Sequence, residues 1–75
     1  MKTEYDKRTL EYCIIDRLTN VASQTHHQLE RHVKKNCPCE ATERQINETM
    51  WNLVTDGTLQ LTQDQYHYQT PRARR

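Results

Sequence analysis

The segment from residue 43 to residue 68 changes its apolar period from helical to alternating, and the change falls at the only glycine of the chain. Apolar residues recur at intervals of four and three, which places them on one face of a helix. Thr42 followed by Gln45 has the spacing of a capping box, so we predict a helix over residues 42–55. Gly57 follows this pattern, where helices commonly end in a left-handed residue. The apolar stripe consists of Ile46, Met50 and Leu53.

Beyond the glycine, two short runs alternate apolar and polar residues, as half-buried strands do. If the runs pair as a hairpin, Leu61 lies opposite Tyr66 and Leu59 lies opposite Tyr68. One face of the hairpin then carries every large apolar side chain. Residues 62–65 contain neither a glycine nor an Asn-Gly pair, so we expect a loose four-residue connection and not a tight two-residue turn.

The earlier part of the chain predicts two more helices and one small strand. Residues 6–20 carry an apolar stripe, and Asp6 is placed to cap the first turn. Thr25 is placed to cap a second helix, which ends at residues 36–39 because a residue that precedes proline is disfavoured in the helical region. We expect a small strand at residues 21–24 that pairs with the hairpin. The inward positions are Leu10, Ile14, Leu18 and Val21, with Cys13 beside them, and then Leu29 and Val33.

Size and composition predict one domain over residues 1–69, followed by a basic, flexible tail at residues 70–75. The net charge of +1 exerts no global electrostatic attraction on nucleic acid. No apolar run is long enough to cross a bilayer, and the first residues lack a signal-peptide core. Three cysteines argue against a disulfide framework. We therefore expect a cytoplasmic protein with free thiols and no membrane partner.

The order helix, short strand, helix, helix, strand, strand over residues 6–68 resembles the winged helix-turn-helix superfamily. The resemblance implies an α+β fold with three helices and a C-terminal β-hairpin wing. It also implies that the 42–55 helix enters the major groove of DNA while the hairpin touches the adjacent backbone. The expected function is that of a small DNA-binding transcriptional regulator. Carried over by position, the residues that contact DNA are Thr42, Arg44, Gln45, Asn47 and Glu48 on the helix, and Lys34, Lys35, Arg72, Arg74 and Arg75 around it.

A second resemblance is to Z-alpha domains, which are winged helices that bind left-handed nucleic acid. It is carried by Ile46-Asn47, Trp51, Leu53, Gly57 and Leu59. In that family an asparagine and an aromatic residue one turn later contact the nucleic-acid backbone, and Asn47 and Trp51 match these positions. Glu43 stands where that family has a basic residue, and the paired prolines of its wing are missing.

Trp51 lies one step off the apolar stripe. We expect it to be partly buried, sealing the edge of its helix against the hairpin. The alternative is a contact with a partner, since tryptophan is enriched where interface energy concentrates. The main alternative function is accordingly a protein-interaction module that uses the 42–55 helix and Trp51 without binding DNA. The expected partner is duplex DNA, and a homodimer or a protein partner is also compatible with the sequence.

Cys37 and Cys39, with a nitrogen from His32 or His27, have donor atoms that suit a metal ion. A tetrahedral site needs four ligands, however, and the chain has no second cysteine pair, so we assign no metal and interpret the segment as an ordinary connection between helices. Cys13 is expected in the core. The chain shows neither a catalytic triad motif nor a glycine-rich phosphate loop, so we expect no enzyme activity and no cofactor.

Overall fold

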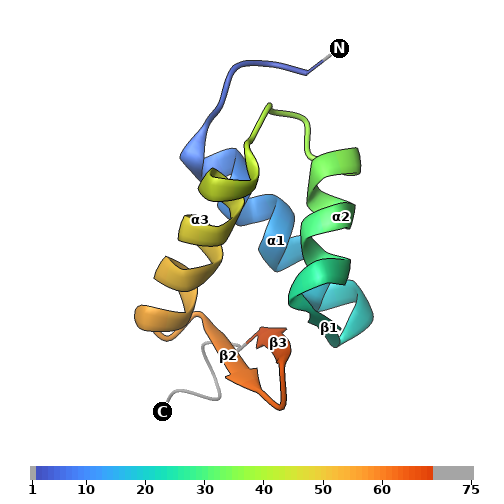
Figure 1. Ribbon diagram of the computed structural model, residues 1–75, viewed down its shortest axis with the longest axis vertical. Coiled ribbons are helices and arrows are strands. Elements are labelled where there is room, and N and C mark those ends of the chain that lie inside the picture. Colours follow the sequence, from blue (N-terminus) through green and yellow to red (C-terminus); the bar gives the residue numbers. More distant parts are fainter. Residues whose placement is uncertain (1, 69–75) are drawn as a thin grey trace.

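Within the part of the chain that the structure describes, the fold consists of three helices and a three-stranded antiparallel sheet (Figure 1). A computed structural model describes residues 2–68. The elements are α1 (Lys7–Val21), β1 (Ser23–Thr25), α2 (His26–Asn36), α3 (Glu43–Thr55), β2 (Leu59–Thr62) and β3 (Gln65–Tyr68). This is the predicted order, so the α+β layout of a winged helix-turn-helix with a C-terminal hairpin is confirmed. Over the residues described, no helix combines the length and apolar character needed to cross a membrane.

All three helices begin at the predicted capping residues. Asp6 caps α1, and its Oδ1 accepts hydrogen bonds from the amides of Arg8 and Thr9 at 2.9 and 3.3 Å. Thr25 and Thr42 open α2 and α3 with complete capping boxes, in which the side chain three residues later bonds back to the cap amide. Each cap satisfies amides that have no partner inside the helix, which explains why the helices start there.

The sheet has the strand order β1-β3-β2, with the predicted hairpin register. Leu59 pairs with Tyr68, and Leu61 pairs with Tyr66. The small strand does pair with the hairpin, but it lies at Ser23–Thr25 and not at residues 21–24. The difference arises because α1 continues through Val21, and Ala22, at a φ of 69°, then turns the chain out of the helix.

The prediction of a loose hairpin connection is wrong. Thr62 pairs directly with Gln65, so only Gln63 and Asp64 connect the two strands. Their φ values are 49° and 66°, and two consecutive left-handed residues are typical of a tight type I′ turn. The twist of such a turn matches that of the paired strands, and this match outweighs the poor intrinsic preference of glutamine for the left-handed region.

Replacing the turn with Gln63→Asn and Asp64→Gly is expected to stabilise the protein. Both new residues tolerate the left-handed conformation, so the free energy of unfolding should rise by about 1 kcal/mol. That increase corresponds to a rise of about 4–8 °C in the melting temperature of a domain this small. Thermal unfolding followed by circular dichroism measures it, with Thr62→Gly as a control that should lower the melting temperature. An unchanged or lower value for the double variant would contradict the type I′ assignment.

The core lies between the three helices and the inner face of the sheet. Leu59 and Tyr66 reach into it from the hairpin, whereas Leu61 lies at the outer end and is 39% exposed. Cys37 and Cys39 are also core residues, although the sequence predicts their segment as an ordinary connection. The buried apolar residues are Leu10, Ile14, Leu18, Leu29, Val33, Cys37, Cys39, Ile46, Met50, Leu53, Leu59 and Tyr66.

Candidate nucleic-acid interface

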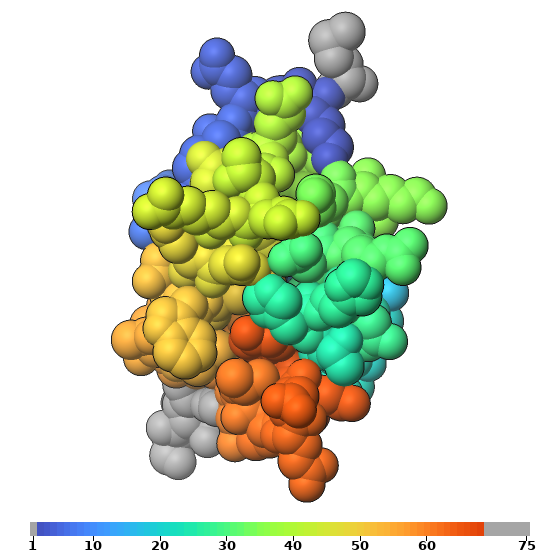
Figure 2. Space-filling view, in the orientation of Figure 1, coloured from blue at the N-terminus to red at the C-terminus, as the bar shows by residue number. Residues whose placement is uncertain are grey.

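Helix α3 buries one face in the core and turns the other outward. Ile46 and Met50 are fully buried, whereas Arg44, Asn47 and Trp51 on the opposite side are exposed. Figure 2 shows α3, in yellow to light orange, beside the green α2, with the orange hairpin below them on the same face of the molecule. The outward side of α3 is therefore open to a large partner, and α2 and the hairpin border it.

Trp51 is 60% exposed, so the expectation that it seals α3 against the hairpin is wrong. The hairpin instead packs Leu59 and Tyr66 against the core. Trp51 directly follows the buried Met50 and is seven residues after Arg44, which places it on the outward side of the helix. An exposed indole on an outward helix face is a feature of binding surfaces.

Two cations expected to contact phosphate or bases are paired with acidic residues of α3. Lys34 Nζ lies 3.3 Å from Glu43 Oε1, and Arg44 Nε lies 3.1 Å from Glu48 Oε1. Both pairs are exposed to solvent, so they contribute little to stability, but they offset positive charge where DNA would lie. The spacing of Arg44 and Glu48, one helical turn apart, predicts such a pair from sequence. The Lys34–Glu43 pair joins α2 to α3, so only the three-dimensional structure reveals it.

Thr42 and Gln45, predicted to contact DNA, form the capping box of α3. Thr42 Oγ1 accepts from the Gln45 amide at 3.1 Å, and Gln45 Oε1 accepts from the Thr42 amide at 2.9 Å. These bonds occupy the oxygens that base reading would use. Asn47 and Lys35 are exposed as expected. The predicted contacts Arg72, Arg74 and Arg75 lie outside the described residues.

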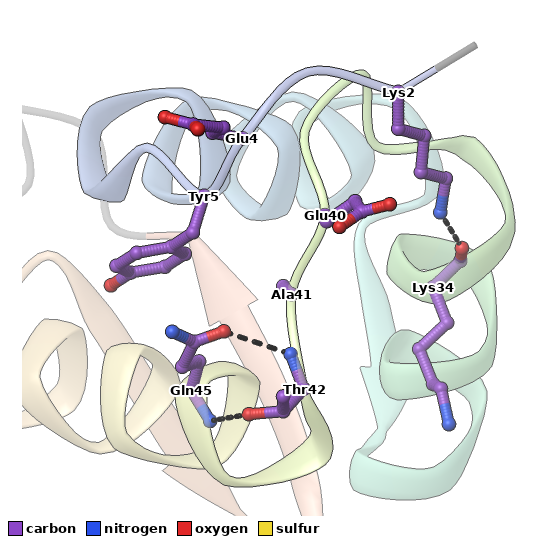
Figure 3. Close-up of a pocket in the computed structure, with 8 residues that line it drawn as sticks. All are labelled: Lys2, Glu4, Tyr5, Lys34, Glu40, Ala41, Thr42 and Gln45. Carbon is purple, nitrogen blue, oxygen red and sulfur yellow. Dashed lines mark hydrogen bonds between the residues drawn. The ribbon is translucent and has the colours of Figure 1, made fainter.

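The amino-terminal segment lies over the connection between α2 and α3 (Figure 3). The Thr3 amide donates to Pro38 O at 2.9 Å, and the Glu40 amide donates to Thr3 O at 2.8 Å. Lys2 Nζ donates to the carbonyl of Lys34. These bonds fix the connection that leads into α3.

A pocket of about 480 Å³ lies between this segment and the start of α3. Its lining includes Lys2, Glu4, Lys34 and Glu40, so its two positive and two negative side chains offset each other. This balance gives the pocket no net preference for an ionic ligand, and we do not regard it as the functional site.

His26 connects the start of α2 to the hairpin. Its Nδ1 lies 3.3 Å from the hydroxyl of Tyr66 on β3, and its Nε2 lies 3.4 Å from the Glu30 carboxylate. Burial raises the pKa of Tyr66. Because Tyr66 is itself a core residue, this contact helps to hold α2 and the hairpin in a fixed relation on the face they share with α3.

The three cysteines lie close together, with all thiols free. The sulfurs of Cys37 and Cys39 are 3.4 Å apart. Burial, followed by the neighbouring thiols of Cys37 and Cys39, raises the pKa of Cys13 to about 12 from its usual value of 9.0. A thiol with such a pKa is a poor nucleophile near neutral pH, because the thiolate is the reactive form.

His32, the expected nitrogen ligand of a metal ion beside Cys37 and Cys39, has a different partner. His32 is half-buried, and its Nδ1 lies 3.2 Å from the side-chain nitrogen of Asn36. Burial and the nearby Arg17 lower the pKa of His32. Within residues 2–68, no group of three or more histidine, cysteine, aspartate or glutamate side chains is arranged to hold a metal ion.

The raised pKa of Cys13 predicts a loss of stability in alkaline solution. Below pH 9 the thiol keeps its proton in both the folded and unfolded states. Between pH 9 and about 12 the unfolded chain releases this proton while the folded protein retains it, so the free energy of unfolding falls as pH rises. Urea unfolding at pH 7 and at about pH 10.5 measures the fall, and Cys13→Ala should reduce it. Tyr66, whose pKa burial also raises, contributes a fall that both proteins share. An equal fall in the two proteins would therefore leave no contribution from Cys13 and would contradict the prediction.

Comparison with known proteins adds no family assignment, because no protein-family model, curated protein or solved structure matches the chain.

Proposed function

We propose that the domain binds duplex DNA, with α3 in the major groove. The observation that carries the proposal is the exposure of Arg44 and Asn47 on the side of α3 opposite its buried residues. The major groove is wide enough to admit an α-helix, and its base edges are read by side chains of these types. The hairpin beside α3 is the element that reaches the neighbouring backbone.

In this proposal the cations of α2 make the phosphate contacts. Arg31 and Lys35 are exposed, and Lys34 joins them when a phosphate replaces Glu43 as its partner. Asn47 has the amide geometry that pairs with adenine N6 and N7. Because two cations near α3, Lys34 and Arg44, are already paired with carboxylates, the attraction to phosphate is modest. Binding as a dimer would supply a second set of contacts.

A fluorescence-anisotropy titration with mixed-sequence duplex DNA tests the proposal. The buffer contains reductant and chelator, and salt is varied from low to moderate. The affinity should fall with salt, by a logarithmic slope of about 0.9 for each phosphate contact. Lys35→Glu should weaken binding to every duplex, whereas Glu11→Gln on α1 serves as a control for a charge change elsewhere. An absence of binding at low salt would overturn the proposal.

Trp51 favours a second candidate function, a protein-interaction module that does not bind DNA. Tryptophan exposed to this extent is costly to leave in water and contributes strongly when a partner buries it. The neutralised charges of Lys34 on α2 and Arg44 on α3 also suit a protein surface better than a phosphate backbone. In this case Trp51→Ala should abolish association with the partner, while Arg44→Glu and Lys34→Glu leave duplex binding undetectable, as it is in the unmodified protein.

The fluorescence of Trp51, the only tryptophan, reports directly on the α3 face. The free protein should show the red-shifted emission of a water-exposed indole, because the side chain is 60% exposed. Saturating duplex DNA should quench this emission or shift it to shorter wavelength as the face is covered. A Tyr12→Phe variant, altered at an exposed aromatic residue on α1, should give the same response. Unchanged emission at saturation would show that DNA binds elsewhere.

A further inference from the structure

Among the ion pairs within residues 2–68, only Arg44–Glu48 has both members on the outward side of α3. Arg44 Nε and Glu48 Oε1 are 3.1 Å apart, and the two side chains are 88% and 64% exposed. Helix stability is a weak reason for the pair, since the order with the acidic residue first is the more stabilising one. A cation in the first turn also opposes the helix dipole.

The bond within the pair uses only part of each side chain. Arg44 donates through Nε, so the donors on its two terminal nitrogens are left for another acceptor. Glu48 accepts through Oε1, and a carboxylate has further lone pairs on both oxygens. The pair therefore presents two donor nitrogens and a carboxylate acceptor side by side, held together by a hydrogen bond within one helical turn.

We infer that the Arg44–Glu48 pair reads a single G·C base pair, an inference that rests on the proposed DNA binding. In the major groove a G·C pair presents two acceptors, guanine N7 and O6, and then one donor, the N4 amino group of cytosine. The donors of Arg44 match the guanine acceptors, and the carboxylate of Glu48 matches the cytosine donor.

An A·T pair presents acceptor, donor and acceptor in the same order. It would set the adenine amino group against an Arg44 donor and thymine O4 against the Glu48 carboxylate. The reversed C·G pair places its donor opposite Arg44. Both alternatives set a donor against a donor and an acceptor against an acceptor, so the pair discriminates against both. Because its net charge is zero, it contributes to selectivity more than to general attraction for phosphate.

Selection from duplexes with a randomised window, followed by sequencing and anisotropy titration, tests the inference. Recovered duplexes should share one G·C pair at a fixed position, and its replacement by A·T or C·G should weaken binding at least about fivefold. Arg44→Ala should remove the preference at that position, and Glu48→Ala should reduce it. Arg31→Ala, on α2, should weaken binding to all duplexes equally and keep the preference.

The outcomes separate the inference from the proposal beneath it. Salt-sensitive binding with no preference for any base pair would overturn the reading by Arg44 and Glu48 while leaving DNA binding in place. A preference that survives Arg44→Ala would likewise overturn it. An absence of binding to every duplex would overturn the proposed function itself. Circular dichroism tests whether each variant is folded, and all three substitutions affect exposed positions.

Discussion

Replacing Ile46 with alanine is expected to lower the free energy of unfolding by about 2–5 kcal/mol. Ile46 is fully buried and belongs to the apolar cluster between the helices and the sheet. The loss combines the transfer energy of the missing methylene groups with the cavity left behind. It is large for a chain of 75 residues, since the stability of globular proteins is about 0.05–0.15 kcal/mol per residue. Urea unfolding followed by circular dichroism measures the change.

Two variants serve as comparisons for Ile46→Ala. Ile46→Val removes a single methylene and should cost about 0.5–1.5 kcal/mol. Asn47→Ala, at the exposed neighbouring position, should change stability by less than about 0.5 kcal/mol. If Ile46→Ala were no more destabilising than Asn47→Ala, the inward face of α3 would be wrongly assigned, and with it the outward face on which the proposed function depends.

Glu43→Lys is expected to increase affinity for duplex DNA, on the order of tenfold at low salt. The substitution removes the carboxylate that now pairs with Lys34 at 3.3 Å, and it adds a cation at the start of α3. Lys34 is then free to bind phosphate. The logarithmic dependence of binding on salt should steepen by about 0.9 for each additional phosphate that the protein neutralises. Anisotropy titration across a series of salt concentrations measures both quantities.

Glu11→Lys, on α1, makes the same change in net charge away from α3 and is the matched control for Glu43→Lys. It should raise affinity much less and leave the salt slope almost unchanged, because a charge outside the interface neutralises no phosphate. The cation that Glu43→Lys places at a helix start costs about 0.3–1 kcal/mol of stability, so the variant should remain folded. Equal effects of the two variants would argue against α3 as the DNA-binding element.

The parts of the fold that could be predicted from sequence are those governed by local chemistry. Asp6, Thr25 and Thr42 predict the helix starts, because capping bonds span only three residues. The alternation around Leu59 and Tyr66 predicts the register, because a shift by one residue would move these side chains to the wrong face.

Sequence-based prediction fails where the rest of the fold decides the outcome. The Gln63–Asp64 turn follows the twist of its strands and not the preferences of its residues. Trp51 lies one step off the buried stripe of α3, and only the packed fold shows that the hairpin leaves this side chain 60% exposed. Cys37 and Cys39 are buried because the amino-terminal segment and α1 cover their connection, and no short pattern in the sequence describes that cover.

The sequence predicts which residues of α3 point outward, but it does not predict how far their charges are neutralised. The periodicity of α3 indicates which residues point outward, and Arg44, Asn47 and Glu48 do so. The cross-helix pair of Lys34 and Glu43 depends on how α2 packs beside α3, so its neutralising effect is visible only in three dimensions. The spacing of Thr42 and Gln45 predicts their capping bonds, and those same bonds make Gln45 a poor candidate for base reading.

The strand order β1-β3-β2 leaves β1 and β2 as the edges of the sheet. Unpaired edge strands are the usual starting point for aggregation, because their backbone groups can add a strand from a second molecule. Here the edges offer only the three residues of Ser23–Thr25 and the four of Leu59–Thr62. A strand from a second molecule could pair with either edge over only three or four residues. The short edges of this sheet therefore limit self-association through backbone hydrogen bonds.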